Sequence, residues 1–490
     1  MMLSIIVTIL RGVGVLSLGF FGYLGYNLFF HPLRSYPGPW YAKSSILWFV
    51  YQSFVGDYPF KVHELHLKYG PIVRIAPNEL AYTDPQAWKD IYGHRTGQPE
   101  NVKDPSQNID DDPAHPSIVF AGREQHSKLR KLLSNAFSDK AMREQEPVLT
   151  SYVDQLVEGL RKQCSEPLDL VQWYNFTTFD IIGHLAFAEP FDCLSNSAYH
   201  PWVHMIFSTF KFVTWIRALN RLAPGFSTFL MRMAPKRVLR EHAANFQLSR
   251  EKVLRRKANK PEYVDFLTNL LSAEESGKLT ERDIVNNGPT LVVAGSETTA
   301  TVLSGATFFI LKDQSVYGKL KEEVRSSFQN VGDITLNKMG ELQYLHAVLD
   351  EALRLYPPGA NNHPRLTPPQ GATICGRFVP GNCMVGINQY AMFRSPLNFA
   401  DPDAFIPERS IDRAGKWIAD KRDALQPFSF GPRNCIGRNL AFSEMRLIMC
   451  RLLFSFDLEL APGQEDWLNQ KVYTSWEKKP LMVKLRPIQE

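Results

Sequence analysis

Ten residues near the C-terminus, FSFGPRNCIG at 428–437, restrict the local structure more than any other part of the chain. Gly431 permits a tight turn that a Cβ atom would oppose, and Gly437 lets the following helix lie close to a flat ligand. That helix directs the positive end of its dipole at Cys435, which favours a thiolate. A buried structural thiol is the alternative for a lone cysteine. The agreement of five positions within this short segment favours a metal ligand instead.

Two further side chains in this segment suit a bound macrocycle. Phe428 can pack beside the sulfur and limit its contact with water. Arg433 can pair with a carboxylate of the bound group. Together with Cys435, these residues predict a thiolate bonded to the iron of a haem.

A second segment, AGSETTA at 294–300, falls inside a long predicted helix. The small side chain of Ala294 allows a ligand to approach the backbone. Thr298 can donate a hydrogen bond to a carbonyl one turn back and open the helix locally. Glu297 places a carboxylate beside this hydroxyl, and the pair can relay protons to bound oxygen. Taken alone, the segment is weak evidence, because adjacent threonines in a helix are more commonly structural.

A third segment predicts a buried ionic network. Glu351 and Arg354 are three residues apart, so they share one face of a helix and can pair. Arg409, in a proline-rich passage that precedes the cysteine segment, can join them. A network of this kind would fix the geometry of the passage more than it would add net stability.

The N-terminus predicts a membrane anchor. Residues 12–30 carry no charge and are about long enough to cross a bilayer as a helix. No small-residue cleavage site follows, which argues against the alternative of a cleaved signal sequence. The proline-rich stretch HPLRSYPGPW forms a stiff connector. We therefore expect an anchor at residues 1–33 and one catalytic domain at residues 34–490.

Charge and cysteine usage exclude several classes of protein. The 55 basic and 50 acidic residues are mixed along the chain, with no dense basic run that would bind nucleic acid. The six cysteines are scattered and have no zinc-site spacing, so a disulfide scaffold or a zinc protein is not expected.

The hydrophobic pattern of the remaining chain is mostly helical. It predicts a long helix from just after Thr280 to about Lys312 and a final helix over about 436–454. Residues 72–77 and 79–84 alternate like two paired strands, and short strands are also expected within 372–388 and 457–486. The predicted fold is mainly α, with small β-sheets and one N-terminal transmembrane helix.

Three segments, in this order along the chain, resemble the cytochrome P-450 superfamily of haem-thiolate monooxygenases: AGSETTA, the segment with Glu351 and Arg354, and FSFGPRNCIG. The resemblance covers essentially the whole chain. It implies the large helical fold of that family and haem b, iron protoporphyrin IX, with Cys435 as the axial ligand. It also implies an enzyme that uses O2 and NADPH-derived electrons to hydroxylate or otherwise oxidise a lipophilic small molecule.

The resemblance also assigns roles to residues outside the three segments. His126 and Arg130 fall where the family usually has a Trp-x-x-x-Arg pair that contacts the haem propionates, so a histidine replaces the tryptophan. Arg365 resembles the family's other propionate-binding arginine. The expected substrate contacts are Ala294, Asn361, Asn362 and Thr474.

The stretches YNLFFHPLRSYPGPW and IYGHRTGQPE are similar to those of fungal microsomal members that act in secondary metabolism. This resemblance implies NADPH-cytochrome P-450 reductase as the electron donor, with cytochrome b5 as a second candidate. It also implies a single-pass protein of the endoplasmic reticulum membrane with a cytosolic catalytic domain, so the sequon at Asn175 would stay unmodified. Two other functions remain open: a haem-thiolate isomerase or dehydratase that does not consume O2, and a haem-binding protein without turnover.

Overall fold

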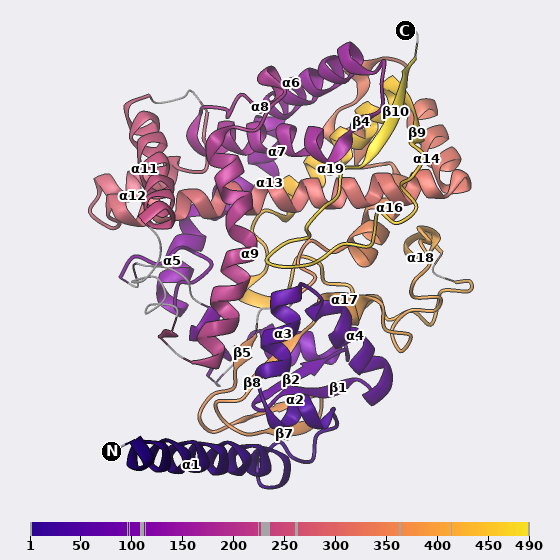
Figure 1. Ribbon diagram of the computed structural model, residues 1–490. Helices are drawn as coiled ribbons and strands as arrows, with labels where there is room; N and C mark the ends of the chain where they lie inside the picture. The colour runs from indigo at the N-terminus through magenta and orange to yellow at the C-terminus, as the bar shows by residue number, and fades with distance from the viewer. Residues whose placement is uncertain are drawn as a thin grey trace.

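The computed structural model describes residues 2–95, 97, 99–107, 112, 114–223, 225–226, 236–259, 263–361, 364–412 and 414–488. Its centre is one long helix, α13 (Glu281–Lys312), which crosses the helical body, and a sheet-containing part lies below it in Figure 1. The mainly α fold with small sheets is therefore confirmed.

The N-terminus of α13 shows why this helix begins where the sequence predicts. Thr280 Oγ1 accepts a hydrogen bond from the Asp283 N–H at 3.2 Å, and Asp283 Oδ2 accepts one from the Thr280 N–H at 2.8 Å. This reciprocal capping satisfies two backbone donors that a helix end leaves unpaired.

The final helix, expected over about 436–454, is observed as α19 (Arg438–Ser455), and the chain forms other long helices besides α13. They include α4 (Tyr58–Tyr69), α5 (Arg123–Ser134), α6 (Asp139–Gln163), α9 (Pro201–Leu222), α11 (Lys236–Ala258), α12 (Thr268–Glu275), α14 (Gln314–Ser327) and α16 (Gln343–Leu355). The shorter helices are α2 (Trp40–Ser44), α3 (Leu47–Val55), α8 (Cys193–Asn196), α15 (Leu336–Met339), α17 (Gln389–Phe393) and α18 (Glu408–Ile411).

One long helix, α7 (Leu170–Phe187), was not predicted. It packs against α13, and it is buried on every side, so its sequence has no polar stripe of helical period. A helix without such a stripe gives little periodic signal.

The strands form small sheets in the described part of the chain. The largest contains β1 (Ile72–Ala76), β2 (Glu79–Tyr82), β8 (Met384–Ile387), β5 (Arg365–Leu366) and β3 (Val102–Lys103), in that order. β1 and β2 pair antiparallel as predicted. The other sheets contain β4 (Leu168–Asp169), β10 (Met482–Pro487) and β9 (Phe456–Leu460), and β6 (Ala372–Ile374) with β7 (Arg377–Val379).

The first helix, α1 (Met2–Phe29), extends along the lower edge of the molecule beside β7 and α2 (Figure 1). Its segment Ile5–Phe29 is apolar and long enough to cross a membrane, and the protein body does not bury it. Its end is held to the body, because Arg74 Nη1 donates to the Asn27 carbonyl at 2.9 Å and Asn27 Nδ2 donates to the Ser44 carbonyl at 2.9 Å. These buried bonds fix the angle at which the helix leaves the globular part.

Candidate active site

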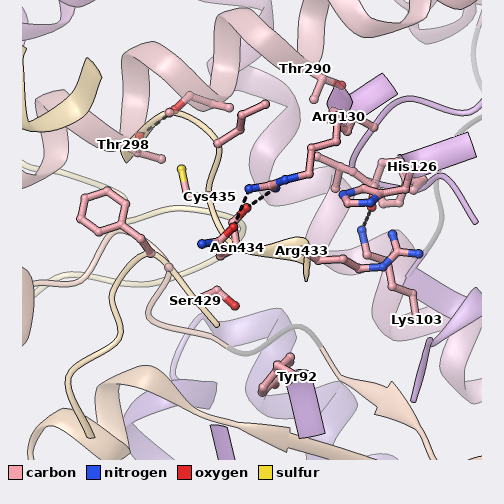
Figure 2. A pocket seen from close by; sticks show the side chains of 18 of the residues that line it. Tyr92, Lys103, His126, Arg130, Thr290, Thr298, Ser429, Arg433, Asn434 and Cys435 are labelled. Atoms are coloured by element: carbon pink, nitrogen blue, oxygen red, sulfur yellow. Dashed lines mark hydrogen bonds between the residues drawn. The ribbon is translucent and has the colours of Figure 1, made fainter. Parts of the chain in front are cut away.

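A cavity of about 880 Å³ lies between α13, α5 and the loop that carries Cys435. The cysteine side chain points into this cavity, as Figure 2 shows. Cys435 is exposed to the cavity, but protein surrounds it on its other sides. This burial raises the pKa of the Cys435 thiol, while the Gly437 N–H and the cations Arg130 and Arg438 act in the opposite direction.

The cysteine loop has the tight geometry that its glycines predict. Gly431 has a φ of +75°, and a Cβ atom there would lie 2.0 Å from the carbonyl oxygen of Tyr92. Only glycine is compatible with both constraints. The loop is closed by the Cys435 N–H, which donates to the Phe428 carbonyl at 2.8 Å. Phe428 therefore contributes a backbone acceptor as well as a ring on the cavity wall.

Gly437 has a different environment. A Cβ atom there would find its nearest protein atoms at 3.7 Å in Phe137 and 3.9 Å at the Cys435 sulfur, which are ordinary contacts. Gly437 also lines the cavity. The close approach that the sequence predicts would therefore be to a bound group, not to the protein.

Among the described residues that line this cavity, cations outnumber carboxylates. The basic lining residues are Lys103, Arg123, Arg130, Arg217, Arg365 and Arg433, and the acidic ones are Glu100 and Asp104. Burial and the positive charges of Arg433 and Arg365 lower the pKa of Lys103 to about 7. An excess of buried positive charge is costly unless an anion neutralises it. The two propionates of a haem fit this requirement, and the thiolate of Cys435 fits its iron.

The predicted propionate ligands converge as expected, and their present partners are mostly backbone groups. Arg130 donates to the Asn434 carbonyl at 2.6 Å and to its side-chain oxygen at 2.5 Å (Figure 2). Arg433 donates to the Ala121 carbonyl at 2.9 Å, and Glu100 lies 3.5 Å away.

His126 and Arg365 complete this group. Burial, followed by the charge of Arg433, lowers the pKa of His126 to about 4, so its imidazole is neutral at physiological pH. The guanidinium of Arg365 lies 5.1 Å from the centre of the Tyr92 ring. His126 and Arg365 both line the cavity. Lys103 was missed by the sequence analysis, because a single lysine beside a short strand carries no recognisable motif.

The helix α13 presents Ala294 and Thr298 to the cavity. Thr298 Oγ1 donates to the Ala294 carbonyl at 2.7 Å, which is the predicted bond to the preceding turn. Glu297 lies on a different face of α13 and does not line the cavity. The expected pairing of its carboxylate with the Thr298 hydroxyl is therefore absent from this structure.

The carboxylate of Glu297 is instead held by the C-terminal segment. Glu297 Oε1 accepts hydrogen bonds from Ser475 at 2.8 Å and from Lys478. Thr301 Oγ1 also contacts Oε1, at 3.3 Å, whereas Oε2 is buried without a partner. Sequence reasoning could not find this ion pair, because Lys478 belongs to no motif and is far from Glu297 in the chain.

The predicted substrate contacts have different outcomes. Ala294 and Asn361 line the cavity, although Asn361 Nδ2 also donates to the Tyr473 carbonyl at 3.0 Å. Thr474 lies off the cavity wall, because it donates to the Phe210 carbonyl of α9 at 3.0 Å. Asn362 lies outside the described residues.

The predicted ionic network is present and buried. Arg354 forms two bonds of 2.8 Å to the two carboxylate oxygens of Glu351. Arg409 donates to Glu351 at 3.1 Å and to Asp420 at 2.9 Å. Arg354 also binds the carbonyls of Phe393, Pro402 and Ala404, and so ties α16 to the passage before the cysteine loop.

Comparison with known proteins agrees with this site. The family model described as Cytochrome P450 matches residues 36–485. Cytochrome P450 monooxygenase astA of Talaromyces wortmannii is 44% identical, over 94% of this chain and 94% of that protein. The trichothecene C-15 hydroxylase of Fusarium sporotrichioides is 42% identical, over 94% of each chain. The averantin hydroxylase of Dothistroma septosporum is 41% identical, over 99% of this chain and 92% of that hydroxylase.

Proposed function

We propose a function from one premise: the chain belongs to the cytochrome P450 family of haem-dependent monooxygenases. Its cofactor is haem b, and its substrate is lipophilic. We propose that it hydroxylates or otherwise oxidises a small natural product in fungal secondary metabolism, and that it does so in the cavity beside Cys435. The relatives named as trichothecene and averantin hydroxylases support this assignment.

One observation carries the proposal: the Cys435 sulfur and the Thr298 residue face the same cavity, from the loop and from α13 respectively. When bound, the haem supplies oxygen activation and the oxidation of an unactivated C–H bond. Cys435 would hold the haem iron through its thiolate, and electron donation from this sulfur would support the oxygen chemistry that the haem supplies. Arg130, Arg365 and Arg433 would bind the propionates, with His126 as a neutral hydrogen-bonding partner.

We propose that Thr298 holds a proton for the reaction at Oγ1. This hydroxyl can exchange its bond to the Ala294 carbonyl for one to a ligand in the cavity. We propose Glu297 as the carboxylate that supplies protons to it, which requires the side chain to leave Lys478. In the ion pair with Lys478, Oε2 of Glu297 accepts no hydrogen bond from the described part of the chain. This unsatisfied oxygen destabilises the ion pair and so lowers the free-energy cost of moving the carboxylate away from Lys478.

The haem assignment is tested by the spectrum of the reduced protein with carbon monoxide. We expect a strongly red-shifted Soret band in the wild type and its loss in Cys435→Ser. Retention of the red-shifted band in that variant would contradict Cys435 as the ligand. The matched control is Cys450→Ser, because Cys450 is buried in α19 away from the cavity.

The monooxygenase assignment is tested with microsomes, a panel of fungal metabolites and labelled dioxygen. We expect NADPH consumption and a product that gains one labelled oxygen atom. Product formation without label would favour the alternative of an isomerase or dehydratase.

The role of Thr298 is tested with Thr298→Ala. In this variant, hydrogen peroxide should rise at the expense of product, whereas an unchanged ratio of peroxide to product would remove Thr298 from the mechanism.

We propose NADPH-cytochrome P-450 reductase as the electron donor, with cytochrome b5 as a second candidate. Arg438 at the start of α19, three residues after Cys435, and Lys131 of α5, next to Arg130, are both exposed. Such cations suit an acidic docking partner, and the docking rate should fall as salt increases. A rate that is insensitive to salt would argue against this face.

We further propose that α1 anchors residues 1–33 in the endoplasmic reticulum membrane and leaves residues 34–490 in the cytosol. The segment Ile5–Phe29 supports this placement, because it is long and apolar enough to cross a membrane. The Asn175 side chain is buried, so glycosylation would also conflict with the folded structure. A mass shift of the protein after glycosidase treatment would contradict the proposed orientation.

A further inference from the structure

Two arginines that line the cavity, Arg123 and Arg217, pair with no carboxylate among the described residues and are not expected propionate ligands, and Arg123 is exposed. Arg217 lies on α9 and lines the cavity. Among the described residues, its buried Nε has no hydrogen-bond partner, and the ring of Phe120 is centred 5.9 Å from the guanidinium. Burial lowers the pKa of Arg217 to about 10. The guanidinium stays charged at neutral pH, and the side chain is only partly exposed.

The same helix shows how this protein satisfies an arginine in a structural role. Arg221 lies one turn further along α9, and its guanidinium donates to Glu79 at 2.6 Å with both side chains buried. It also stacks over Phe49 at 4.0 Å. Arg217 has neither kind of partner at such distances. A charge that is largely removed from water and has no partner costs free energy. The position of Arg217 on the cavity wall therefore indicates that a bound ligand supplies its partner.

The expected propionate ligands enter the cavity from other elements. Arg130 lies on α5, Arg365 on β5 and Arg433 beside Cys435, whereas Arg217 lies on α9. Arg217 therefore reaches the same cavity from a separate element, outside the predicted propionate cluster.

We propose that Arg217 binds the carboxylate of the substrate, so that the enzyme oxidises a lipophilic carboxylic acid. A planar guanidinium matches a carboxylate through two parallel hydrogen bonds. A single guanidinium matches the single charge of a carboxylate better than the double charge of a phosphate dianion. The apolar body of the acid would contact the aliphatic and aromatic lining residues, which include Ile118, Val119, Phe120, Leu291 and Val302. This inference rests on the proposed function of the cavity as the substrate chamber.

Binding of paired probes to the haem-loaded protein in membranes tests the proposal. The probes are dodecanoic acid with dodecanamide, and 1-pyrenebutyric acid with its amide, each titrated by the change in Soret absorbance. We expect the wild type to bind each acid about tenfold more tightly than its amide, because a hydrogen-bonded charge pair is lost with the amide. In Arg217→Gln, this preference should disappear.

The matched control is Lys211→Gln, which removes a cation from the same helix outside the cavity. Lys211 lies 3.7 Å from Glu477 on the surface, so this variant should keep the wild-type preference. Equal binding of acid and amide by the wild type would overturn the proposal, as would an acid preference that survives in Arg217→Gln.

Thermal unfolding separates recognition from a structural role. Without a ligand, Arg217→Gln should melt at the wild-type temperature or above it, because it removes an unpaired buried charge. The acids should raise the melting temperature of the wild type and of Lys211→Gln but not of Arg217→Gln. A lower melting temperature for ligand-free Arg217→Gln would make Arg217 structural. The carbon monoxide spectrum reports on the haem site independently. A failure of the proposed monooxygenase function can therefore be distinguished from a failure of the carboxylate-binding proposal for Arg217.

Discussion

The arginines of the α16 network and the arginines that line the cavity are satisfied in opposite ways. In the α16 network, Arg354 and Arg409 bind carboxylates of the protein itself, Glu351 and Asp420. Around the cavity, Arg130 and its neighbours bind mostly carbonyl oxygens. The first group is complete without a ligand, whereas the second carries an excess of positive charge. The comparison distinguishes arginines that hold the fold from arginines that await an anion.

The largest expected effect is the loss of the folded protein when the complete network is broken. Arg354→Met leaves the Glu351 carboxylate buried beside only Arg409, and breaking such a pair costs about 3–5 kcal/mol. That is a large fraction of the stability of a typical domain. We expect no pigment in the carbon monoxide spectrum and rapid proteolysis in membranes.

The control for this variant is Lys416→Met, which breaks an exposed pair with Asp401 at 3.0 Å in the same passage. Exposed pairs contribute little, so pigment should be retained. Arg354→Met protein that keeps its pigment and resists protease would show that the network is not essential to the fold.

A smaller effect is expected when one cavity arginine is removed. Arg433→Met should leave the fold intact and weaken haem retention by about tenfold, because one charged hydrogen-bonding partner of a propionate is lost. The measurement is the rate of haem transfer to apomyoglobin, with protein content determined separately. If Arg433→Met instead destabilised the haem-free protein as much as Arg354→Met does, Arg433 would belong with the arginines that hold the fold.

Arg130 allows a finer test, because it binds the loop as well as facing the cavity. Arg130→Lys keeps the charge but loses the two simultaneous bonds to Asn434, next to Cys435. We expect a few-fold faster haem loss and a broader Soret band. Asn434→Ala removes only the side-chain acceptor and should have the lesser effect of the two. The reverse order would mean that Arg130 acts mainly through its charge.

The two groups also differ in how far the sequence predicts them. Glu351, Arg354 and Arg409 were predicted together because two of them lie on one helix turn and the third follows a proline motif. The cysteine loop was predictable for a similar reason, since its glycines, Cys435 and Arg433 are contiguous. Local spacing therefore accounts for the parts of the site that are built within one segment.

Contacts between distant segments could not be predicted in this way. Glu297 was expected to work beside Thr298, yet its carboxylate pairs with Lys478 of the C-terminal segment. Thr474 was expected in the cavity, yet it binds the backbone of α9. Lys103 and Arg217 reach the cavity from a strand and a helix with no motif. The helix α7 was missed because burial on all sides erases helical periodicity.

The smallest expected effect is a pH dependence of stability that comes from Lys103, one of the cations that line the cavity. The pKa of Lys103 is about 7 in the folded protein and would return to its ordinary value near 10.5 on unfolding. Between these values the unfolded state binds more protons, so the free energy of unfolding of haem-depleted protein should rise with pH from about 7. We expect a higher melting temperature at pH 8.5 than at pH 6.5. Lys103→Met should lack this difference and should be the more stable protein at pH 6.5.

Bound haem should also reduce the difference in melting temperature between pH 6.5 and pH 8.5, because its propionates would keep Lys103 protonated. The same pH response in haem-loaded and haem-depleted protein would mean that no anion enters this group of cations.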